Sequence, residues 1–178
     1  MIRTERLLLR KPVLEDAEAF LELFTDPVAM EFIGGVHPNA RNDPQFPIHR
    51  WLERWDQNGV GPLVAERRED GLVVGRAGLL VWDVRTWTLT TFDSAGEYAQ
   101  PELGWAFIRA HWGHGYATET ALAVREWARA QIGIGRLISV IAPANVRSQR
   151  LAERLGATPG ETVELFDNGP HVVWEHPR

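Results

Sequence analysis

Two glycines, Gly113 and Gly115, lie between a stretch with strand character and a stretch with helical spacing. Residues 102–108 are rich in aromatic and branched side chains, which favours a strand, and a helical pattern runs from Thr118 to about Ile132. The first N–H groups of a helix lack intrahelical partners and carry a partial positive charge, so a glycine-rich turn there lets an anion approach closely. This order predicts a phosphate-binding turn, with a merely tight connection as the alternative.

Two common phosphate-binding motifs do not fit these residues. A P-loop has Lys followed by Ser or Thr after its second glycine, whereas Tyr116 and Ala117 stand here. The dinucleotide-binding fingerprint needs a third glycine, where this sequence has Thr118, and an acidic residue near the end of the next strand. The strand expected at 137–141 runs on to Pro143 without a carboxylate. These differences argue against a dinucleotide site.

His111 and His114 flank the same turn and raise the question of a metal site. A protein zinc site uses three or four ligands at recognisable spacings, and the neighbouring residues supply no third ligand. The sequence therefore predicts no metal, and His114 is expected to lie beside the phosphates as a loop residue.

Two ordered motifs carry a family resemblance. Residues 112–119 closely resemble the acyl-CoA pyrophosphate loop of the GNAT N-acetyltransferases, in particular the Rim-type branch that acetylates ribosomal-protein N-termini and various small amines. The usual loop begins with Gln or Arg, and Trp112 departs from that but looks like the Rim-type variant. Residues 145–157 resemble the branch's Asn-x-x-Ser helix that ends in Leu-Gly, and residues 3–12 match too. The similarity covers nearly the whole chain.

The resemblance implies an α/β (α+β) fold in which residues 1–178 form a single domain. Its central sheet would be mixed and mostly antiparallel, with six to seven strands, a splayed parallel strand pair and about four flanking helices. The pantetheine arm of acetyl-CoA, the implied co-substrate, would enter the gap between the strands at 102–108 and 137–141. A backbone N–H of Phe107 or Ile108 would then point at the thioester oxygen.

The resemblance also assigns roles to side chains. The implied proton donor to the departing sulfur is Ser148, because the tyrosine that many members carry is missing at Ala152. Glu102 is the implied general base, although an amine that enters neutral could manage without one. The implied cofactor-binding residues lie at the strand end, in the glycine turn and on the later helix: Phe107, Ile108, Trp112, Gly113, His114, Gly115, Tyr116, Ala117, Thr118, Asn145 and Ser148.

Composition limits the possible classes of protein. The chain has 178 residues, 44% of them hydrophobic, which suffices for one domain with a full core. Its net charge of −5 gives no bulk attraction to nucleic acid or to anionic membranes. Cysteine is absent, and the sequence contains neither an apolar leader nor a membrane-length apolar run. We expect a cytoplasmic protein without nucleic-acid or membrane partners.

Periodicity and turn residues predict the remaining elements. Trp51 and Trp55 should lie on one face of a helix and pack against the core of the protein. Alternation should place Glu102 and Gly104 on the opposite face of their strand from Leu103. The predicted elements are a strand at 5–10, a helix at 14–24, a possible short helix at 28–33, a loop at 35–47, a helix at 48–55, strands at 59–67 and 72–84 joined through Asp70-Gly71, a connection at 85–97 with a possible extra hairpin at 87–90, a helix from the N-cap Asn145 to Leu155 with Gly156 as C-cap, and a hairpin of strands 162–166 and 171–175.

Three hypotheses for function follow. The favoured one is an N-acetyltransferase that moves the acetyl group of acetyl-CoA to a primary amine, either a peptide N-terminus or a small polyamine or aminoglycoside-like acceptor. The others are a catalytically inactive CoA-binding module and a domain for another nucleotide. The protein is expected to be a monomer or a homodimer.

Overall fold

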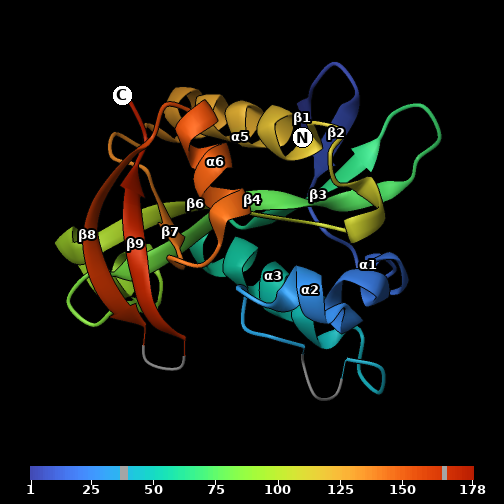
Figure 1. Ribbon diagram of the computed structural model, residues 1–178, viewed down its shortest axis with the longest axis horizontal. Coiled ribbons are helices and arrows are strands. Elements are labelled where there is room, and N and C mark those ends of the chain that lie inside the picture. The colour runs from blue at the N-terminus through green and yellow to red at the C-terminus, as the bar shows by residue number, and fades with distance from the viewer. Residues whose placement is uncertain (37–39, 166–167) are drawn as a thin grey trace.

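A mixed sheet forms the centre of the computed structural model, which describes residues 1–36, 40–165 and 168–178. Within these residues the sheet has nine strands in the order β1-β2-β3-β4-β6-β7-β9-β8, with β5 paired to β4 (Figure 1). The strands are β1 (Ile2–Arg3), β2 (Leu7–Arg10), β3 (Pro62–Arg67), β4 (Val73–Asp83), β5 (Thr88–Leu89), β6 (Ala99–Phe107), β7 (Ile138–Ile141), β8 (Thr158–Leu165) and β9 (Gly169–Glu175). The predicted fold class is confirmed, with two short strands more than expected.

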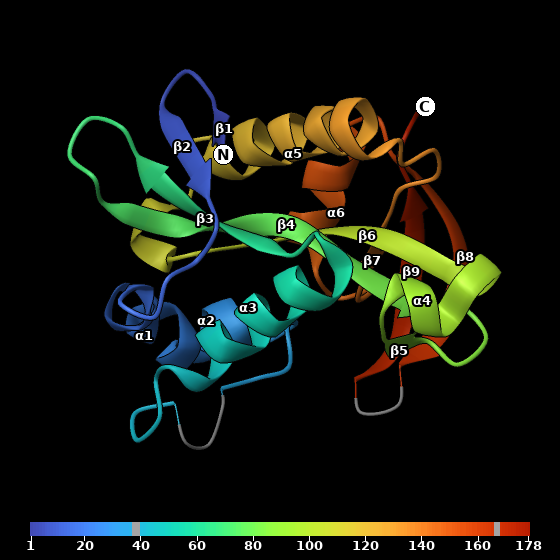
Figure 2. The same ribbon diagram turned by 180° about the vertical axis from the view of Figure 1, so that it is seen from behind.

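Helices cover both faces of the sheet. α5 and α6 lie on one face, and α1, α2 and α3 lie on the other, as both views show (Figures 1 and 2). The helices are α1 (Asp16–Thr25), α2 (Pro27–Met30), α3 (Phe46–Asn58), α4 (Phe92–Ala95), α5 (Tyr116–Ile132) and α6 (Val146–Arg154), with 3₁₀ turns at Gly96–Tyr98 and Arg109–His111. None of the helices in the described ranges is long and apolar enough to cross a membrane.

The two faces of β6 belong to different apolar clusters, as the alternation predicts. Leu103 and Phe107 are buried in the cluster that contains Val124 of α5. Ala106 belongs to the cluster that contains Phe20 of α1 and Trp51 of α3. Because each helical layer packs on its own face of the strand, β6 is held from both sides.

Gly75 brings β4 unusually close to β6. It lies opposite Phe107 in the antiparallel register, and a Cβ there would lie 2.5 Å from a ring carbon of Phe107 and 2.6 Å from the carbonyl oxygen of Ala106. The register between β3 and β4 also shifts at this point, as expected for a bulge, because Ala65 pairs with Gly75 whereas Glu66 pairs with Val73. Only glycine therefore fits beside the end of β6.

β6 and β7 form the parallel pair, and they diverge. Their only register pair in the described chain is Glu102 with Ile138. One residue further on, the carbonyl oxygen of Leu103 accepts a hydrogen bond from the side-chain hydroxyl of Ser139 at 2.6 Å. The predicted splayed strand pair is thus present, and it opens toward the carboxyl end of β6.

Several predicted boundaries were wrong. α3 begins at Phe46 rather than Ile48, because Pro47 fits the first turn of a helix, where its missing N–H costs nothing. β3 begins at Pro62 rather than Gly59, because Gly59 ends α3 with φ +66° and donates its N–H to the Trp55 carbonyl at 3.0 Å. The connection at 85–97 contains β5, which forms the suggested extra hairpin, and also α4. β8 already begins at Thr158, and the predicted strand end at 166 lies outside the described residues.

The predicted N-cap of α6 is confirmed, whereas the C-cap is Leu155, one residue before the predicted Gly156. The side-chain oxygen of Asn145 accepts from the Ser148 N–H at 3.1 Å, and Gly156 follows the last turn with φ +78°.

Replacing Asn145 by alanine is expected to lower the free energy of unfolding by about 1 kcal/mol, because the Ser148 N–H loses its acceptor. Asn145→Asp keeps an acceptor at the same place and should retain most of the stability. Urea denaturation of the three proteins checks this, and equal midpoints for wild type and Asn145→Ala would show that the cap contributes nothing.

Candidate active site

A cavity of about 670 Å³ lies between the end of β6, the start of α5 and one side of α6. Val28 of α2 and Ile33, which follows α2, line it from the helical layer on the other face of the sheet. The predicted cofactor-binding residues that line it are Phe107, Trp112, Gly113, Gly115, Tyr116, Ala117, Thr118, Asn145 and Ser148. Ile108 and His114 do not line it.

The glycine turn has the backbone geometry of an anion-binding loop. Gly113 and Gly115 have φ of +81° and +80°, which side-chain-bearing residues rarely adopt. α5 starts at Tyr116, and its first intrahelical hydrogen bond runs from the Glu119 N–H to the Gly115 carbonyl at 3.1 Å. In the described part of the chain no side chain caps the N–H groups of residues 116–118. These donors are available to a ligand in the cavity.

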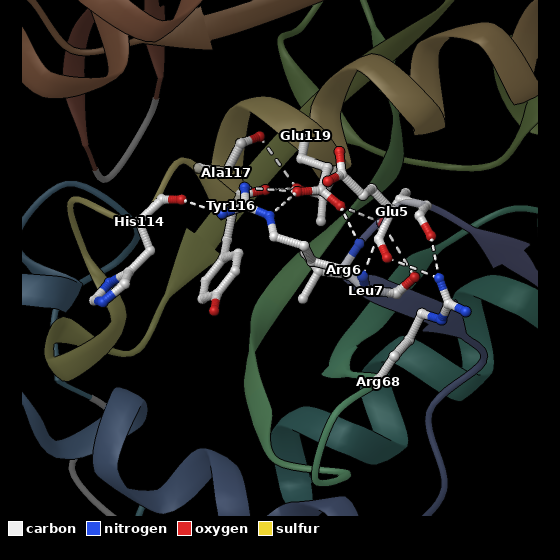
Figure 3. A network of polar contacts seen from close by, with 10 residues as sticks. Glu5, Arg6, Leu7, Arg68, His114, Tyr116, Ala117 and Glu119 are labelled. Atoms are coloured by element: carbon white, nitrogen blue, oxygen red, sulfur yellow. Dashed lines mark hydrogen bonds and ion pairs between the residues drawn. The ribbon is translucent and has the colours of Figure 1, made fainter.

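Arg6, which lies between β1 and β2, hydrogen-bonds to this turn (Figure 3). Arg6 donates from Nη1 to the carbonyl oxygen of His114 at 2.8 Å and from Nε to Oε2 of Glu119 at 2.7 Å. Its guanidinium also lies over the Tyr116 ring, 4.8 Å from the centroid. The Thr4 hydroxyl donates to the other oxygen of Glu119 at 2.5 Å. No pattern in the sequence indicated a role for Thr4, Arg6 or Glu119.

His114 helps to shape the turn instead of lining the cavity. Its ring stacks on Tyr116 with centroids 5.5 Å apart, and its Nδ1 lies 3.0 Å from the carbonyl oxygen of Trp112. That this side chain lies beside bound phosphates stays a prediction, and these contacts hold the ring outside the cavity lining. Trp112 does line the cavity, and its Nε1 donates to the Phe107 carbonyl at 2.8 Å.

Only one of the two backbone donors expected at the end of β6 is available. The Ile108 N–H donates to the carbonyl oxygen of Val74 on β4 at 3.0 Å, so it faces away from the gap. Successive N–H groups of a strand point to opposite edges, so the Phe107 N–H points to the edge where β6 and β7 separate. The expectation for Ile108 was wrong because β4 pairs one residue beyond the end of β6.

A second cavity, of about 210 Å³, lies beside the first between β4, β6 and β7. Polar side chains that line it include Glu102, Arg76, Ser139 and His171. Ser148 and Trp105 line both cavities, and the Trp105 Nε1 donates to the Ser148 hydroxyl oxygen at 3.3 Å. The Ser148 hydroxyl therefore stands where the two cavities meet.

Glu102 is almost fully buried, with 8% of its surface exposed. The Trp82 Nε1 donates to its Oε2 at 2.5 Å, and the Val140 N–H donates to its Oε1 at 3.3 Å. Burial raises the pKa of Glu102 above its ordinary value, although these donors and the positive charges of Arg76 and Arg54 oppose the rise. A carboxyl group with a raised pKa beside a cavity can take up a proton.

The larger cavity also carries positive charge from three arginines of α6, which were not among the predicted site residues. Arg147, Arg150 and Arg154 line it from α6, at spacings of three and four residues that place them on one side of a helix. The guanidinium of Arg147 lies 4.4 Å from the centroid of the Trp112 ring. This arginine spacing is the signal in the sequence that could have predicted a positively charged helix face. No group of three or more His, Asp or Glu residues that could hold a metal occurs within residues 1–36, 40–165 and 168–178.

Known proteins resemble this chain over nearly its whole length. The Bacillus subtilis (strain 168) protein YkkB is 29% identical over 180 residues, which cover 97% of this chain and 92% of that protein. The crystal structure of an acetyltransferase from Agrobacterium tumefaciens str. C58 aligns with a TM-score of 0.79 and 27% identity, covering 99% of this chain and 94% of the other. The aminoglycoside acetyltransferase AAC(6')-Ib in complex with coenzyme A aligns with a TM-score of 0.74 and 20% identity, covering 97% and 95%, and so shares the fold. The family description "Acetyltransferase (GNAT) domain" matches residues 6–158, and the chain belongs to this family.

Proposed function

We propose that this protein is an N-acetyltransferase that moves the acetyl group of acetyl-CoA to a primary amine by direct attack in a ternary complex. The observation that carries the proposal is the junction at Ser148, where a cavity suited to CoA meets a second cavity with a buried carboxyl group. Two adjoining cavities let a donor and an acceptor bind at once, and no covalent enzyme intermediate is then needed.

Acetyl-CoA would bind in the larger cavity. Its diphosphate would accept hydrogen bonds from the N–H groups at residues 116–118, and the arginines of α6 would neutralise phosphate charge. The pantetheine arm would extend along the open edge of β6. The Phe107 N–H at that edge is the proposed donor to the thioester oxygen, where negative charge develops during attack.

The proposed reaction proceeds in one acyl transfer. The amine nitrogen attacks the thioester carbon, the new N–C bond forms and the C–S bond breaks. The nitrogen loses a proton to Glu102, directly or through water, and the Ser148 hydroxyl donates a hydrogen bond to the departing thiolate. A buried Glu102 with a raised pKa suits this exchange, because a raised pKa makes the ionised carboxylate a stronger base than an exposed one.

The proposal includes the Rim-type branch, a single domain over residues 1–178 and a cytoplasmic monomer or homodimer. The Trp112-Gly113 start of the loop and the Asn145-to-Ser148 helix start support the branch. One continuous sheet that runs from the first strand to the last supports a single domain. The net charge of −5 supports an acceptor other than nucleic acid.

Thiol release from acetyl-CoA in the presence of a panel of primary amines tests the proposal. Turnover with any amine, together with the mass of the acetylated product, would support it. Tight CoA binding without turnover across a broad panel would instead favour the inactive CoA-binding module.

Replacing Ser148 by alanine is expected to lower kcat about tenfold or more, because the developing thiolate loses a hydrogen bond of about 1.5–3 kcal/mol. The KM for acetyl-CoA should change little, since the backbone cap between Ser148 and Asn145 remains. Steady-state kinetics check both values. Ser94→Ala, at an exposed serine of α4 that lines neither cavity, is the control. An unchanged kcat in Ser148→Ala would remove this side chain from the mechanism.

A further inference from the structure

Arg76 lines the second cavity without an anionic partner of its own. It lies on β4 opposite Ala106 of β6, and its side chain makes no hydrogen bond or ion pair with the described residues. Its guanidinium lies over the Trp51 ring, whose centroid is 5.5 Å from the guanidinium carbon. A face-on aromatic ring leaves the N–H groups of the guanidinium free to bind something else.

Glu102 lines the same cavity but is not paired with Arg76. Its two carboxyl oxygens accept hydrogen bonds from the Trp82 indole and the Val140 N–H, and no ion pair joins it to Arg76. Arg54 from α3 adds a second positive charge that acts on both groups. Of these three groups Arg76 and Glu102 line the cavity, and the positive charge of Arg54 adds to that of Arg76, although Glu53 on α3 partly offsets it.

The space beside Arg76 is open. A Cβ on Gly104 would find one neighbour within 4 Å, the Nη1 atom of Arg76 at 3.9 Å. Gly104 follows Glu102 on the same face of β6, so the guanidinium stands over bare backbone next to the carboxyl group. Burial lowers the pKa of Arg76 to about 10, which leaves the group charged at neutral pH. A charged donor beside open space can form charge-assisted hydrogen bonds to an anion.

We propose that the acceptor amine is a small molecule that also carries a carboxylate, and that Arg76 binds this carboxylate in the second cavity. The inference rests on the proposed function, because it takes the second cavity as the place of the acceptor. A cavity of about 210 Å³ suits an amino-carboxylate of a few carbon atoms. The positive charge at Arg76 and Arg54 disfavours polycationic acceptors such as polyamines or aminoglycosides.

Equilibrium binding to the CoA-saturated protein tests the proposal without any need for turnover. Isothermal titration calorimetry would compare glycine, β-alanine, 4-aminobutyrate and 5-aminopentanoate with their carboxamides, which keep the amine and lose the negative charge. We expect at least one amino-carboxylate to bind about tenfold or more tightly than its carboxamide, because the bond to Arg76 is charge-assisted.

Matched variants assign the preference to one side chain. Arg76→Gln should bring the ratio of amino-carboxylate affinity to carboxamide affinity close to one. Arg76→Lys should keep part of the preference, since the positive charge remains while the planar guanidinium with its paired N–H donors is lost. Arg50→Gln, at an exposed arginine on α3 that pairs with Glu53, should leave the ratio unchanged. CoA affinity and thermal denaturation, measured on the same samples, show that each variant is folded.

Two outcomes would overturn the inference: no amino-carboxylate binds more tightly than its carboxamide, or Arg76→Gln keeps the full preference. Failure of the proposed function looks different. Carboxylate-selective binding without acetyl transfer would contradict the proposed enzyme activity and support the anion site. Equal turnover of neutral and carboxylate-bearing amines would support the enzyme activity and contradict the anion site.

Discussion

Gly115→Val is expected to weaken CoA binding about 100-fold. The residue has φ +80°, a conformation strained for any β-branched residue, and a Cβ there would lie 3.4 Å from the Arg6 Nη2. Relaxation of the turn would redirect the N–H groups of residues 116–118. The loss of one or two charge-assisted hydrogen bonds, each contributing about 1.5–3 kcal/mol, gives the stated magnitude. Titration calorimetry with CoA measures it.

The other end of the same helix supplies the control. Gly133 ends α5 with φ +71°, has no heavy atom within 4 Å of a built Cβ, and lies away from both cavities. Gly133→Val should therefore destabilise the protein about as much as Gly115→Val does, because both residues have positive φ, and it should leave CoA affinity unchanged. If the two variants bind CoA equally well, the glycine turn is not the phosphate site.

Glu102→Gln is expected to lower kcat/KM about 100-fold, in line with the usual contribution of a general base. The base must be deprotonated to act, so the wild-type rate should rise with pH through the pKa of Glu102, which burial raises. The glutamine variant should lack this acidic limb and keep its CoA affinity. A full pH profile of both proteins decides the matter, and an acidic limb that persists in the variant would exclude Glu102 as the base.

The same residue predicts a change in stability with pH. A carboxyl group whose pKa is raised by folding favours the native state in its neutral form, so its contribution is present below the unfolded pKa of about 4.3 and is lost as pH rises through the folded pKa. Wild type should thus lose more stability than Glu102→Gln across this window. Urea denaturation at several pH values measures it, with Glu153→Gln at an exposed position of α6 as control. Parallel curves for wild type and Glu102→Gln would contradict the prediction.

The sequence predicted those parts of the fold that depend on local patterns. The alternation along β6, the glycine turn and the Asn145 cap each arise from a few neighbouring residues, and all three have the expected local structure. The two-residue strand β1 is too short to leave a periodic signal, and β5, which is equally short, was predicted only as a possible extra hairpin. Helix α4 was not predicted, because it begins at the N-cap Thr91 within a stretch of polar residues that is typical of a connection.

Parts of the candidate site depended on contacts that no local pattern contains. The hydrogen bond from Arg6 to the His114 carbonyl joins residues 108 positions apart. The engagement of the Ile108 N–H depends on where β4 begins relative to the end of β6, because Val74 near the start of β4 supplies the acceptor. The free guanidinium of Arg76 becomes apparent only when Gly104 is known to lie beneath it. Such features follow from tertiary packing rather than from residue type.

Gly75 has a consequence for attempts to alter this protein in the laboratory. It lines neither cavity, yet any larger side chain there would displace Phe107, whose amide is the proposed donor to the thioester oxygen. A displacement of about 1 Å at a reacting centre can cost about 100-fold in rate. Libraries confined to cavity-lining positions would leave untouched a residue on the neighbouring strand that sets the position of that amide.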